Sequence, residues 1–232
     1  MTAGRLLLWR HGRTAFNAEA RLQGQVDIPL DDVGRWQART AAARMLERHE
    51  PTHIIASDLS RAAQTAHYLG RAAELDVVLE PLVRERAFGD WEGLTGDEID
   101  ARWPDEFALW RAGGEPARVG AESRARVAER MAEGIAAHAS ALGRRDTLVV
   151  VSHGAAISSA VGALLGMEPQ WRGIAGMLNS HWAELVSSSA PDQASWRLAG
   201  YNLGPTDASS DWNAGPDSAH GSDADAQTRD PA

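Results

Sequence analysis

The chain contains neither cysteine nor lysine. The absence of cysteine excludes disulfides, thiolate metal sites and cysteine nucleophiles. The absence of lysine excludes the GK[ST] phosphate-binding loop and Schiff-base chemistry. All 23 basic residues are therefore arginines, whose planar guanidinium groups suit two-point binding of phosphate or carboxylate.

The chain also lacks the excess of positive charge that a nucleic-acid-binding protein would show, because its formal net charge is −9. Its 232 residues, 44% of them hydrophobic, suffice for one domain with a sizeable core. The first residues lack the charged start and long apolar core of a signal peptide, so we expect a cytoplasmic protein. Residues 204–232 hold six Asp and one Arg among Gly, Ser and Pro, which predicts a disordered acidic tail.

One long stretch without acidic or basic side chains, Leu148–Met167, raises the question of a membrane span. His153, Gly154 and several serines interrupt this stretch. We therefore expect a strand, a turn and a buried helix there, and no membrane partner.

Three apolar runs lead into residues that can bind an anion. Arg10 and His11 follow the first run, His153 follows a run late in the chain, and both histidines precede a glycine. Arg61 comes shortly after a third run that ends at residue 56. Ligands of open α/β sheets bind beyond the carboxyl ends of the strands, so we expect these three ends to converge. The sequence thus predicts two imidazoles and two guanidiniums around one anion.

Periodicity and capping residues predict alternating helices and strands between these ends. Residues 1–203 should form one domain, with a cap inserted at about 88–120. We expect helices from Asp31 or Asp32 through Arg48, from within 57–60 to Ala73 and over Glu122–His138. Strands are expected over Asp76–Leu79, Ser180–Val186 and Trp196–Tyr201. The cap should contain an amphipathic segment over Asp97–Ala112, which Pro104 interrupts.

Other patterns have simpler explanations. The stretch His49–His53 matches H-E-x-x-H, but Pro51 at its centre breaks the helix that such a zinc site needs. Ser152 beside His153 lacks the G-x-S-x-G turn of many serine hydrolases. A lone histidine is more often a hydrogen-bonded core residue, yet two His-Gly pairs in matching contexts favour an anion site. We therefore expect no metal site.

Taken together, four co-linear motifs resemble the histidine phosphatase superfamily, which also contains the cofactor-dependent phosphoglycerate mutases. The resemblance extends from about Leu6 to Leu203. It implies an α/β fold, a three-layer sandwich around a mostly parallel sheet with one antiparallel edge strand and a small helical cap. The motifs are Arg10-His11-Gly12-Arg13-Thr14 with Asn17, the run Ser57–Ala66, the loop Glu85–Gly93 and Ser152-His153-Gly154.

The resemblance implies a metal-independent phosphomonoesterase that needs no cofactor. His11 would be the nucleophile that takes the phosphoryl group, and Glu85 would protonate the leaving oxygen. A phosphohistidine intermediate makes chemical sense, because it replaces one very slow hydrolysis by two easier displacements. The phosphate-binding residues implied by the resemblance are Arg10, Arg61, His153 and Asn17.

Within the superfamily, the residues favour a phosphatase over a mutase. In the mutases, a pattern similar to Glu-Ser-x-Trp-Asn follows Arg-His-Gly, whereas this chain has Arg13–Asn17 at that place. The lysine contacts of the mutases are also impossible here, because the chain has no lysine. A cofactor-dependent phosphoglycerate mutase remains the alternative enzyme. A catalytically silent phospho-ligand binder is the alternative from another class.

Several loops are similar to those of the actinobacterial glucosyl-3-phosphoglycerate phosphatases, among them Arg21–Asp27 and Gly176–Trp182. This similarity implies a small phosphorylated metabolite as partner, and it suggests a homodimer. We expect Trp91, Trp103 and Trp110 either to line the substrate entrance or to pack the cap onto the sheet. Expected further substrate contacts are Gln23, Gly24, Arg86, Trp103 and Gly154.

Overall fold

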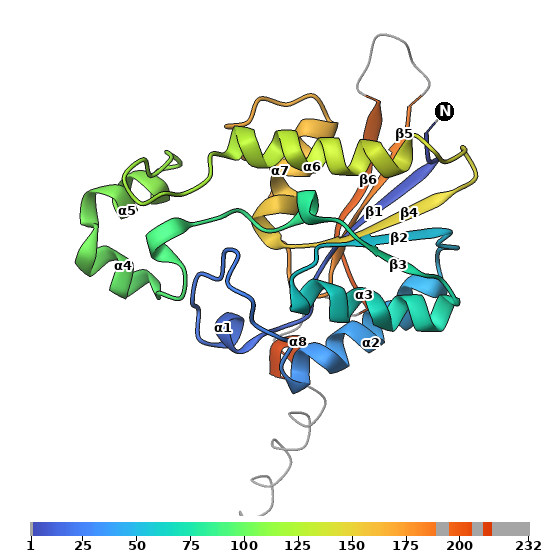
Figure 1. Ribbon diagram of the computed structural model, residues 1–232, viewed down its shortest axis with the longest axis horizontal. Coiled ribbons are helices and arrows are strands. Elements are labelled where there is room, and N and C mark those ends of the chain that lie inside the picture. The colour runs from blue at the N-terminus through green and yellow to red at the C-terminus, as the bar shows by residue number, and fades with distance from the viewer. Residues whose placement is uncertain (1, 189–194, 206–210, 215–232) are drawn as a thin grey trace, which may run out of the picture.

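A six-stranded sheet with the order β3-β2-β4-β1-β5-β6 forms the centre of the molecule. The computed structural model describes residues 2–188, 195–205 and 211–214. Strands β1 to β4 are mutually parallel, whereas β5 is antiparallel to β1 and β6 is antiparallel to β5 (Figure 1). The expected α/β architecture with antiparallel pairing towards one edge is confirmed. The strands are β1 (Arg5–Arg10), β2 (His53–Ala56), β3 (Val77–Leu79), β4 (Thr147–Ser152), β5 (Trp182–Ser187) and β6 (Trp196–Leu203).

The register of β1 and β4 determines where the site residues lie. Leu6 pairs with Leu148 and Arg10 pairs with Ser152. Since the two strands are parallel, His11 and His153 leave them at the same level. Every residue of β4 is buried, as expected for a strand in the middle of a sheet that is covered on both faces.

Helices cover both faces of the sheet. Alternate residues of β1 point to opposite sides: Leu6 and Leu8 join a core with α6 and α7, and Leu7 and Trp9 join a core with α2 and α3. Figure 1 shows these two helix pairs on opposite sides of the strands. The helices that carry the core are α2 (Asp32–Leu46), α3 (Ser60–Ala73), α6 (Arg124–Ala139) and α7 (Gly154–Leu164).

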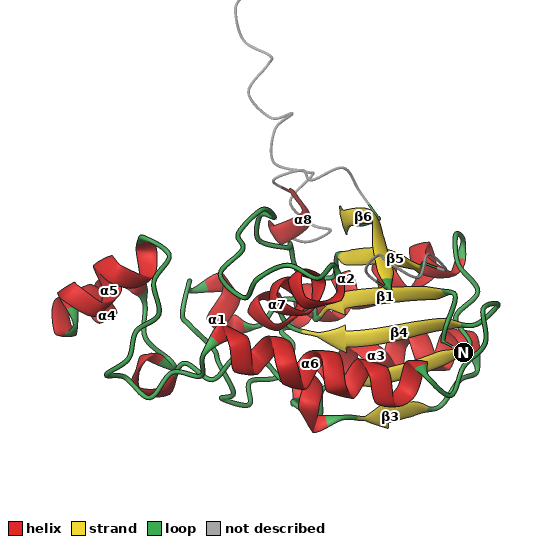
Figure 2. Ribbon diagram, turned by 90° about the horizontal axis from the view of Figure 1, so that it is seen from above, coloured by secondary structure: helices red, strands yellow, loops and turns green. Residues whose placement is uncertain are grey.

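A cap projects beyond the carboxyl ends of the parallel strands (Figure 2). It contains η2 (Gly89–Trp91), α4 (Gly96–Arg102) and α5 (Pro104–Arg111). The cap has its own apolar cluster around Phe88, Trp91, Ile99 and Val119, and its two ends meet where the backbone N–H of Asp90 donates to the carbonyl of Val119. Gly89 is required at this crossing, because its φ is +58° and a Cβ would lie 1.9 Å from that carbonyl oxygen. The smaller elements elsewhere are α1 (Ala15–Ala18) and η1 (Pro81–Val83).

The end of the chain contains one correction to the sequence-based expectations. The tail 204–232 was expected to be disordered, but α8 (Asp211–Ala214) is a short helix whose Trp212 is only 1% exposed. One large ring supplies the apolar area that the composition of the tail otherwise lacks. Trp212 lies 4.9 Å from Trp36, ring centre to ring centre, and its Nε1 donates to the carbonyl of Asn179. The rest of the expected tail, 206–210 and 215–232, lies outside the described residues.

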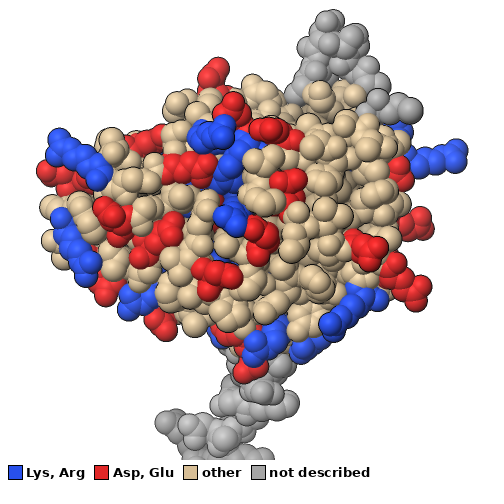
Figure 3. Space-filling view, in the orientation of Figure 1, with Lys and Arg blue, Asp and Glu red and all other residues tan. Residues whose placement is uncertain are grey.

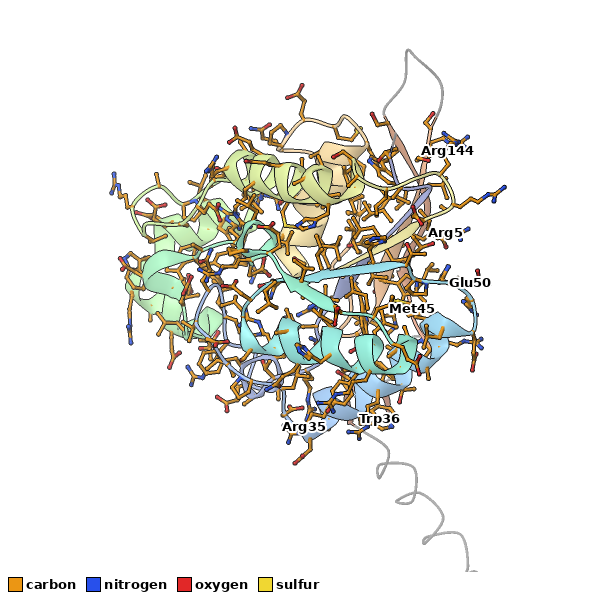
Figure 4. All side chains as sticks on the ribbon, turned by 45° about the vertical axis from the view of Figure 1, so that its right-hand side comes forward. Arg5, Arg35, Trp36, Met45, Glu50 and Arg144 are labelled. Atoms are coloured by element: carbon orange, nitrogen blue, oxygen red, sulfur yellow. The ribbon has the colours of Figure 1, made fainter. Side chains whose placement is uncertain are left out.

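On the face seen in Figure 3, arginines and acidic residues are interspersed. Among the described residues, no helix is both long and apolar enough to cross a membrane. The stretch 148–167 forms β4 and α7, as expected. Figure 4 labels Arg5, Glu50 and Arg144 at the end of the sheet that lies away from the cap.

Candidate active site

A cavity of about 520 Å³ lies between the carboxyl ends of the strands and the cap. The convergence expected from the sequence is present, because Arg10, His11 and Arg61 all line this cavity. His153 lies directly behind its wall, with its ring centre 5.1 Å from that of His11. Of the other expected site residues, Asn17, Gln23, Gly24, Glu85 and Gly154 also line it.

His11 is a neutral imidazole with one nitrogen free to react. It is 2% exposed, and its Nδ1 lies 2.6 Å from the carbonyl oxygen of Gly12. That contact assigns the ring proton to Nδ1, so Nε2 carries the lone pair. Burial, followed by the charges of Arg61 and Arg10, holds the pKa of His11 well below its usual value. His11 is therefore unprotonated at neutral pH, as a nucleophile must be.

The turn that carries His11 requires a glycine at position 12. A Cβ there would lie 2.4 Å from the carbonyl oxygen of Gly34 in α2. The backbone N–H of Gly12 donates to the Thr65 hydroxyl at 3.1 Å, which ties the turn to α3. The His-Gly pair therefore reflects a close approach of two backbones at the residue that follows the imidazole.

His153 has the complementary tautomer. The Arg61 Nε donates to its Nδ1 at 3.2 Å, which leaves the proton on Nε2. Burial, then the neighbouring Arg61 and His11, lower the pKa of His153 well below its usual value. Its Nε2 is buried and has no hydrogen-bond partner among the residues that the structure describes. A neutral N–H donor therefore remains available on the ring next to that of His11.

Arg61 is completely buried and fixes the neighbouring loop. Its Nη1 donates to the carbonyl of Val26 at 2.7 Å and its Nη2 to that of Gly24 at 2.8 Å. A guanidinium has five N–H groups, so each terminal nitrogen retains a second one for a ligand. Burial is the main reason why its pKa falls to about 10, and the group stays charged at neutral pH.

Arg10 and Glu85 both line the cavity. Arg10 donates from Nη1 to the carbonyl of Met177, and its buried Nε has no partner within the described residues. The Glu85 carboxylate accepts from the backbone N–H groups of Ala155 at 3.2 Å and Ala156 at 2.8 Å, at the start of α7. A helix N-terminus favours a carboxylate and fixes its position there.

A hydrogen-bonded network under the cavity includes one residue to which the sequence assigned no role. Asn179 donates from Nδ2 to the carbonyl of His11 at 3.1 Å and to Oδ1 of Asn17 at 3.2 Å. The Thr14 hydroxyl donates to Oε1 of Gln23 at 2.9 Å in the same region. Asn179 belongs to a run that resembled the glucosyl-3-phosphoglycerate phosphatases, and that likeness was its only signal in the sequence.

The three cap tryptophans do not act alike. Trp110 lines the cavity together with Phe107, whereas Trp91 is fully buried inside the cap. Trp103, for which a substrate contact was expected, does not line the cavity and packs against the apolar cluster of the cap. Arg86 does not line it either, and lies in an adjoining pocket.

The two patterns explained away at the sequence level lie outside the cavity. The Ser152 hydroxyl is buried and donates to the carbonyl of Val83 at 2.7 Å. His53 begins β2, so no helix spans the H-E-x-x-H match. The described residues contain no group of three or more His, Cys, Asp or Glu side chains placed to hold a metal ion.

This arrangement suits a tetrahedral anion next to a nucleophile. Neutral His11 offers a lone pair and the two arginines offer N–H donors in the cavity, while His153 offers a further N–H from directly behind the cavity wall. Such donors stabilise charge on the equatorial oxygens of a phosphoryl group during its transfer. The Glu85 carboxyl lies in the same cavity, where it can exchange protons with the leaving group and with water.

Comparison with known proteins points to the same chemistry. A family model described as "Histidine phosphatase superfamily (branch 1)" matches residues 6–199. A glucosyl-3-phosphoglycerate phosphatase from Mycobacterium tuberculosis is 38% identical over 214 residues, covering 87% of this chain and 96% of the relative. A probable phosphoglycerate mutase from Escherichia fergusonii is 37% identical over 169 residues, which cover 71% of this chain and 75% of that relative.

Solved structures agree with the sequence comparisons. The structure of a mycobacterial glucosyl-3-phosphoglycerate phosphatase in complex with inorganic phosphate superimposes with a TM-score of 0.75 at 36% identity. The match covers 87% of this chain and 98% of that one.

Proposed function

This chain belongs to the histidine phosphatase superfamily and is a phosphatase, and from that premise we propose that it hydrolyses small phosphate monoesters through a phosphohistidine at His11. The observation that carries this proposal is the pair of complementary tautomers. His11 Nε2 carries a lone pair in the cavity, where Arg10 and Arg61 also lie, and the His153 ring, 5.1 Å away between ring centres, carries a proton on Nε2.

In the first step, His11 Nε2 attacks the phosphorus atom and the bond from phosphorus to the ester oxygen breaks. Glu85, protonated at this stage, gives its proton to the leaving oxygen. His153 and the arginines donate to the equatorial oxygens, whose charge would otherwise have to be stabilised by solvent. The bond between His11 Nδ1–H and the Gly12 carbonyl supports the positive charge that develops on the ring.

In the second step, a water molecule attacks the phosphohistidine. The Glu85 carboxylate takes a proton from this water, the bond between phosphorus and nitrogen breaks, and inorganic phosphate leaves. The residues supply every charge and proton in this scheme, so we propose that the reaction proceeds without a metal ion. Hydrolysis in the presence of a chelator is the expected result.

Glucosyl-3-phosphoglycerate is our proposed substrate, because relatives that carry this name match nearly the whole chain. The relatives named as probable phosphoglycerate mutases match a shorter part of it. A panel of phosphorylated metabolites that includes this compound would test the proposal. Interconversion of 3- and 2-phosphoglycerate after priming with the bisphosphate would instead identify a mutase.

The decisive test replaces the nucleophile. We expect His11→Ala to lower the hydrolysis of a generic aryl phosphate by on the order of 10⁴-fold or more, because the covalent route is lost. Wild-type protein exposed briefly to labelled substrate should yield an acid-labile phosphoenzyme, and the variant should not. His67→Ala is the matched control, because His67 is exposed on α3. Full activity of His11→Ala would refute the proposal, and absence of a phosphoenzyme in the wild type would favour a silent binder.

The proposal extends to the surroundings in which the enzyme works. We place it in the cytoplasm as a homodimer that acts on small metabolites, with no nucleic-acid partner. Light scattering after size-exclusion chromatography tests the dimer directly, and a monomer at micromolar concentration would contradict it.

A further inference from the structure

A second pocket of about 260 Å³ adjoins the catalytic cavity. The two spaces share wall residues from the cap, from α7 and from the loop that follows it, so a single molecule could extend from one into the other. The shared residues are Phe88, Trp110, Ala155, Ser158 and Gly176.

Three arginines from separate segments line the second pocket. Arg86 follows Glu85, Arg124 begins α6, and Arg172 lies in the loop after α7. Arg124 Nη1 donates to the carbonyl of Gly113 at 3.1 Å, and Arg172 Nη2 donates to the same carbonyl at 2.5 Å. Two guanidinium groups therefore converge on a single neutral acceptor.

Among the described residues, none of these three arginines forms an ion pair with a carboxylate. Other arginines form ten such ion pairs with Asp or Glu. Burial, together with Arg172 and Arg86, lowers the pKa of Arg124 to about 10. Such mutual repulsion is relieved when an anion binds between the cations.

Nearby carboxylates act on Arg86 and Arg124 through space and offset part of their charge. Glu168 is the acidic residue in the lining. Glu115 accepts from the backbone N–H of Arg124 at 2.8 Å, and the Glu122 carboxylate pairs with Arg130 at 2.8 Å. Three cations therefore face the pocket against one lining carboxylate.

Arg86 provides a direct sign of an expected ligand. It is 2% exposed, and its Nε donates to the carbonyl of Glu122 at 2.6 Å. The guanidinium lies over the Phe88 ring, 5.3 Å from its centre, but its buried Nη2 has no hydrogen-bond partner in the described part of the chain. A buried guanidinium N–H without an acceptor is costly, and an anionic ligand would supply that acceptor.

We propose that Arg86, Arg124 and Arg172 bind a second anionic group of the substrate whose phosphoryl group is attacked by His11. The enzyme is then selective for phosphate monoesters that also carry a carboxylate or a second phosphate. This inference rests on the function proposed above and specifies the class of substrate. Arg124 and Arg172 are its specificity-determining residues.

Matched substrates test the inference. 3-Phosphoglycerate and glycerol 3-phosphate differ mainly in a carboxylate against a hydroxymethyl group, and fructose 1,6-bisphosphate and fructose 6-phosphate differ in a second phosphate. We expect the wild type to show a higher kcat/KM for the anionic member of at least one pair, and the pair identifies the anion. Arg172→Gln, at an exposed position, should reduce that preference by about tenfold, the usual loss for a charge-assisted hydrogen bond.

Arg126→Gln is the matched control, because Arg126 lies on the same helix as Arg124 and pairs with Glu129 on the surface. It should leave the preference unchanged. Equal kcat/KM values within both pairs in the wild type, or the same preference in Arg172→Gln as in Arg126→Gln, would overturn the inference. Hydrolysis of an aryl phosphate separates the two proposals: if it persists while no preference is found, only the second pocket has been misassigned.

Discussion

Two regions of the molecule bring arginines together but are built in different ways. The first is the phosphate cradle, formed by Arg10, His11, Arg61 and His153, and the second is the three-arginine pocket, formed by Arg86, Arg124 and Arg172. In the cradle, His11 and His153 lie at the ends of neighbouring strands, and Arg61 is completely buried between backbone carbonyls. In the pocket, exposed Arg172 comes from a loop and Arg124 from the first turn of a helix. The cradle is held by the sheet, whereas the pocket is assembled from connecting segments.

This difference separates chemistry from specificity. Fixed strand ends hold reacting groups within narrow geometric limits, which phosphoryl transfer requires. Loops on a rigid scaffold can change without disturbing the core, and they commonly determine which substrate is bound. The two regions should therefore respond to substitution by very different amounts.

The largest effect is expected in the cradle. Arg61→Gln removes a charge that faces the phosphate and also removes donors to the carbonyls of Gly24 and Val26. We expect kcat to fall by about 10²- to 10³-fold, the usual loss when a preorganised donor is removed. The measurement is steady-state hydrolysis of an aryl phosphate.

Arg71→Gln is the control for this variant, since Arg71 lies on the same helix and is exposed. Its kcat should equal that of the wild type. Circular dichroism and thermal unfolding distinguish a lost contact from a lost fold. A folded Arg61→Gln enzyme within a few-fold of wild-type activity would remove the distinction between cradle and pocket.

The cradle could be predicted from the sequence because its residues sit at fixed positions relative to strands. Arg10 and His11 come at the end of one apolar run, and His153 directly follows another. The strands formed by these two runs pair with each other. A short motif therefore determines both the local turn and the spatial neighbour. The antiparallel strand pairing and the helical layers on both faces of the sheet were predicted only through the resemblance to the histidine phosphatase superfamily.

The rest could not be predicted, because it depends on long-range contacts without a pattern. Arg124 and Arg172 meet at the carbonyl of Gly113, and the sequence separations give no hint of this. Trp212 lies in a polar tail, yet one ring packs against Trp36 and makes a short helix part of the core. Burial of a single aromatic residue outweighs the composition of the segment around it.

An intermediate effect is expected in the dependence of stability on pH. Both cradle histidines have pKa values lowered by burial and by neighbouring arginines. Below about pH 6.5 the unfolded chain takes up protons on these residues and the folded chain does not, so the free energy of unfolding falls as the pH decreases. We expect His153→Gln to make this dependence less steep by about 1 kcal/mol per pH unit.

Urea unfolding at pH 7.5 and 5.5 measures this difference. His49 and His181, whose pKa values burial also lowers, are present in both proteins and cancel in the comparison. Arg172→Gln represents the other region and should keep the wild-type slope, because an arginine does not titrate in this range. Identical slopes for the wild type and His153→Gln would show that His153 is not held neutral in the folded state.

The smallest effect is expected at the boundary between the two regions. Trp110 lines both the catalytic cavity and the arginine pocket, and its ring packs on Phe107 at 5.8 Å between centres. Trp110→Ala would merge the two spaces and remove one wall from a bound substrate. We expect the ratio of kcat/KM for 3-phosphoglycerate to that for an aryl phosphate to change by about threefold to tenfold, the typical contribution of one aromatic contact. Trp103→Ala removes the same side chain from the cap but from neither of these pockets, so it should leave the ratio unchanged. If both variants shift the ratio equally, Trp110 acts only by packing the cap, and the boundary between cradle and pocket has no part in substrate selection.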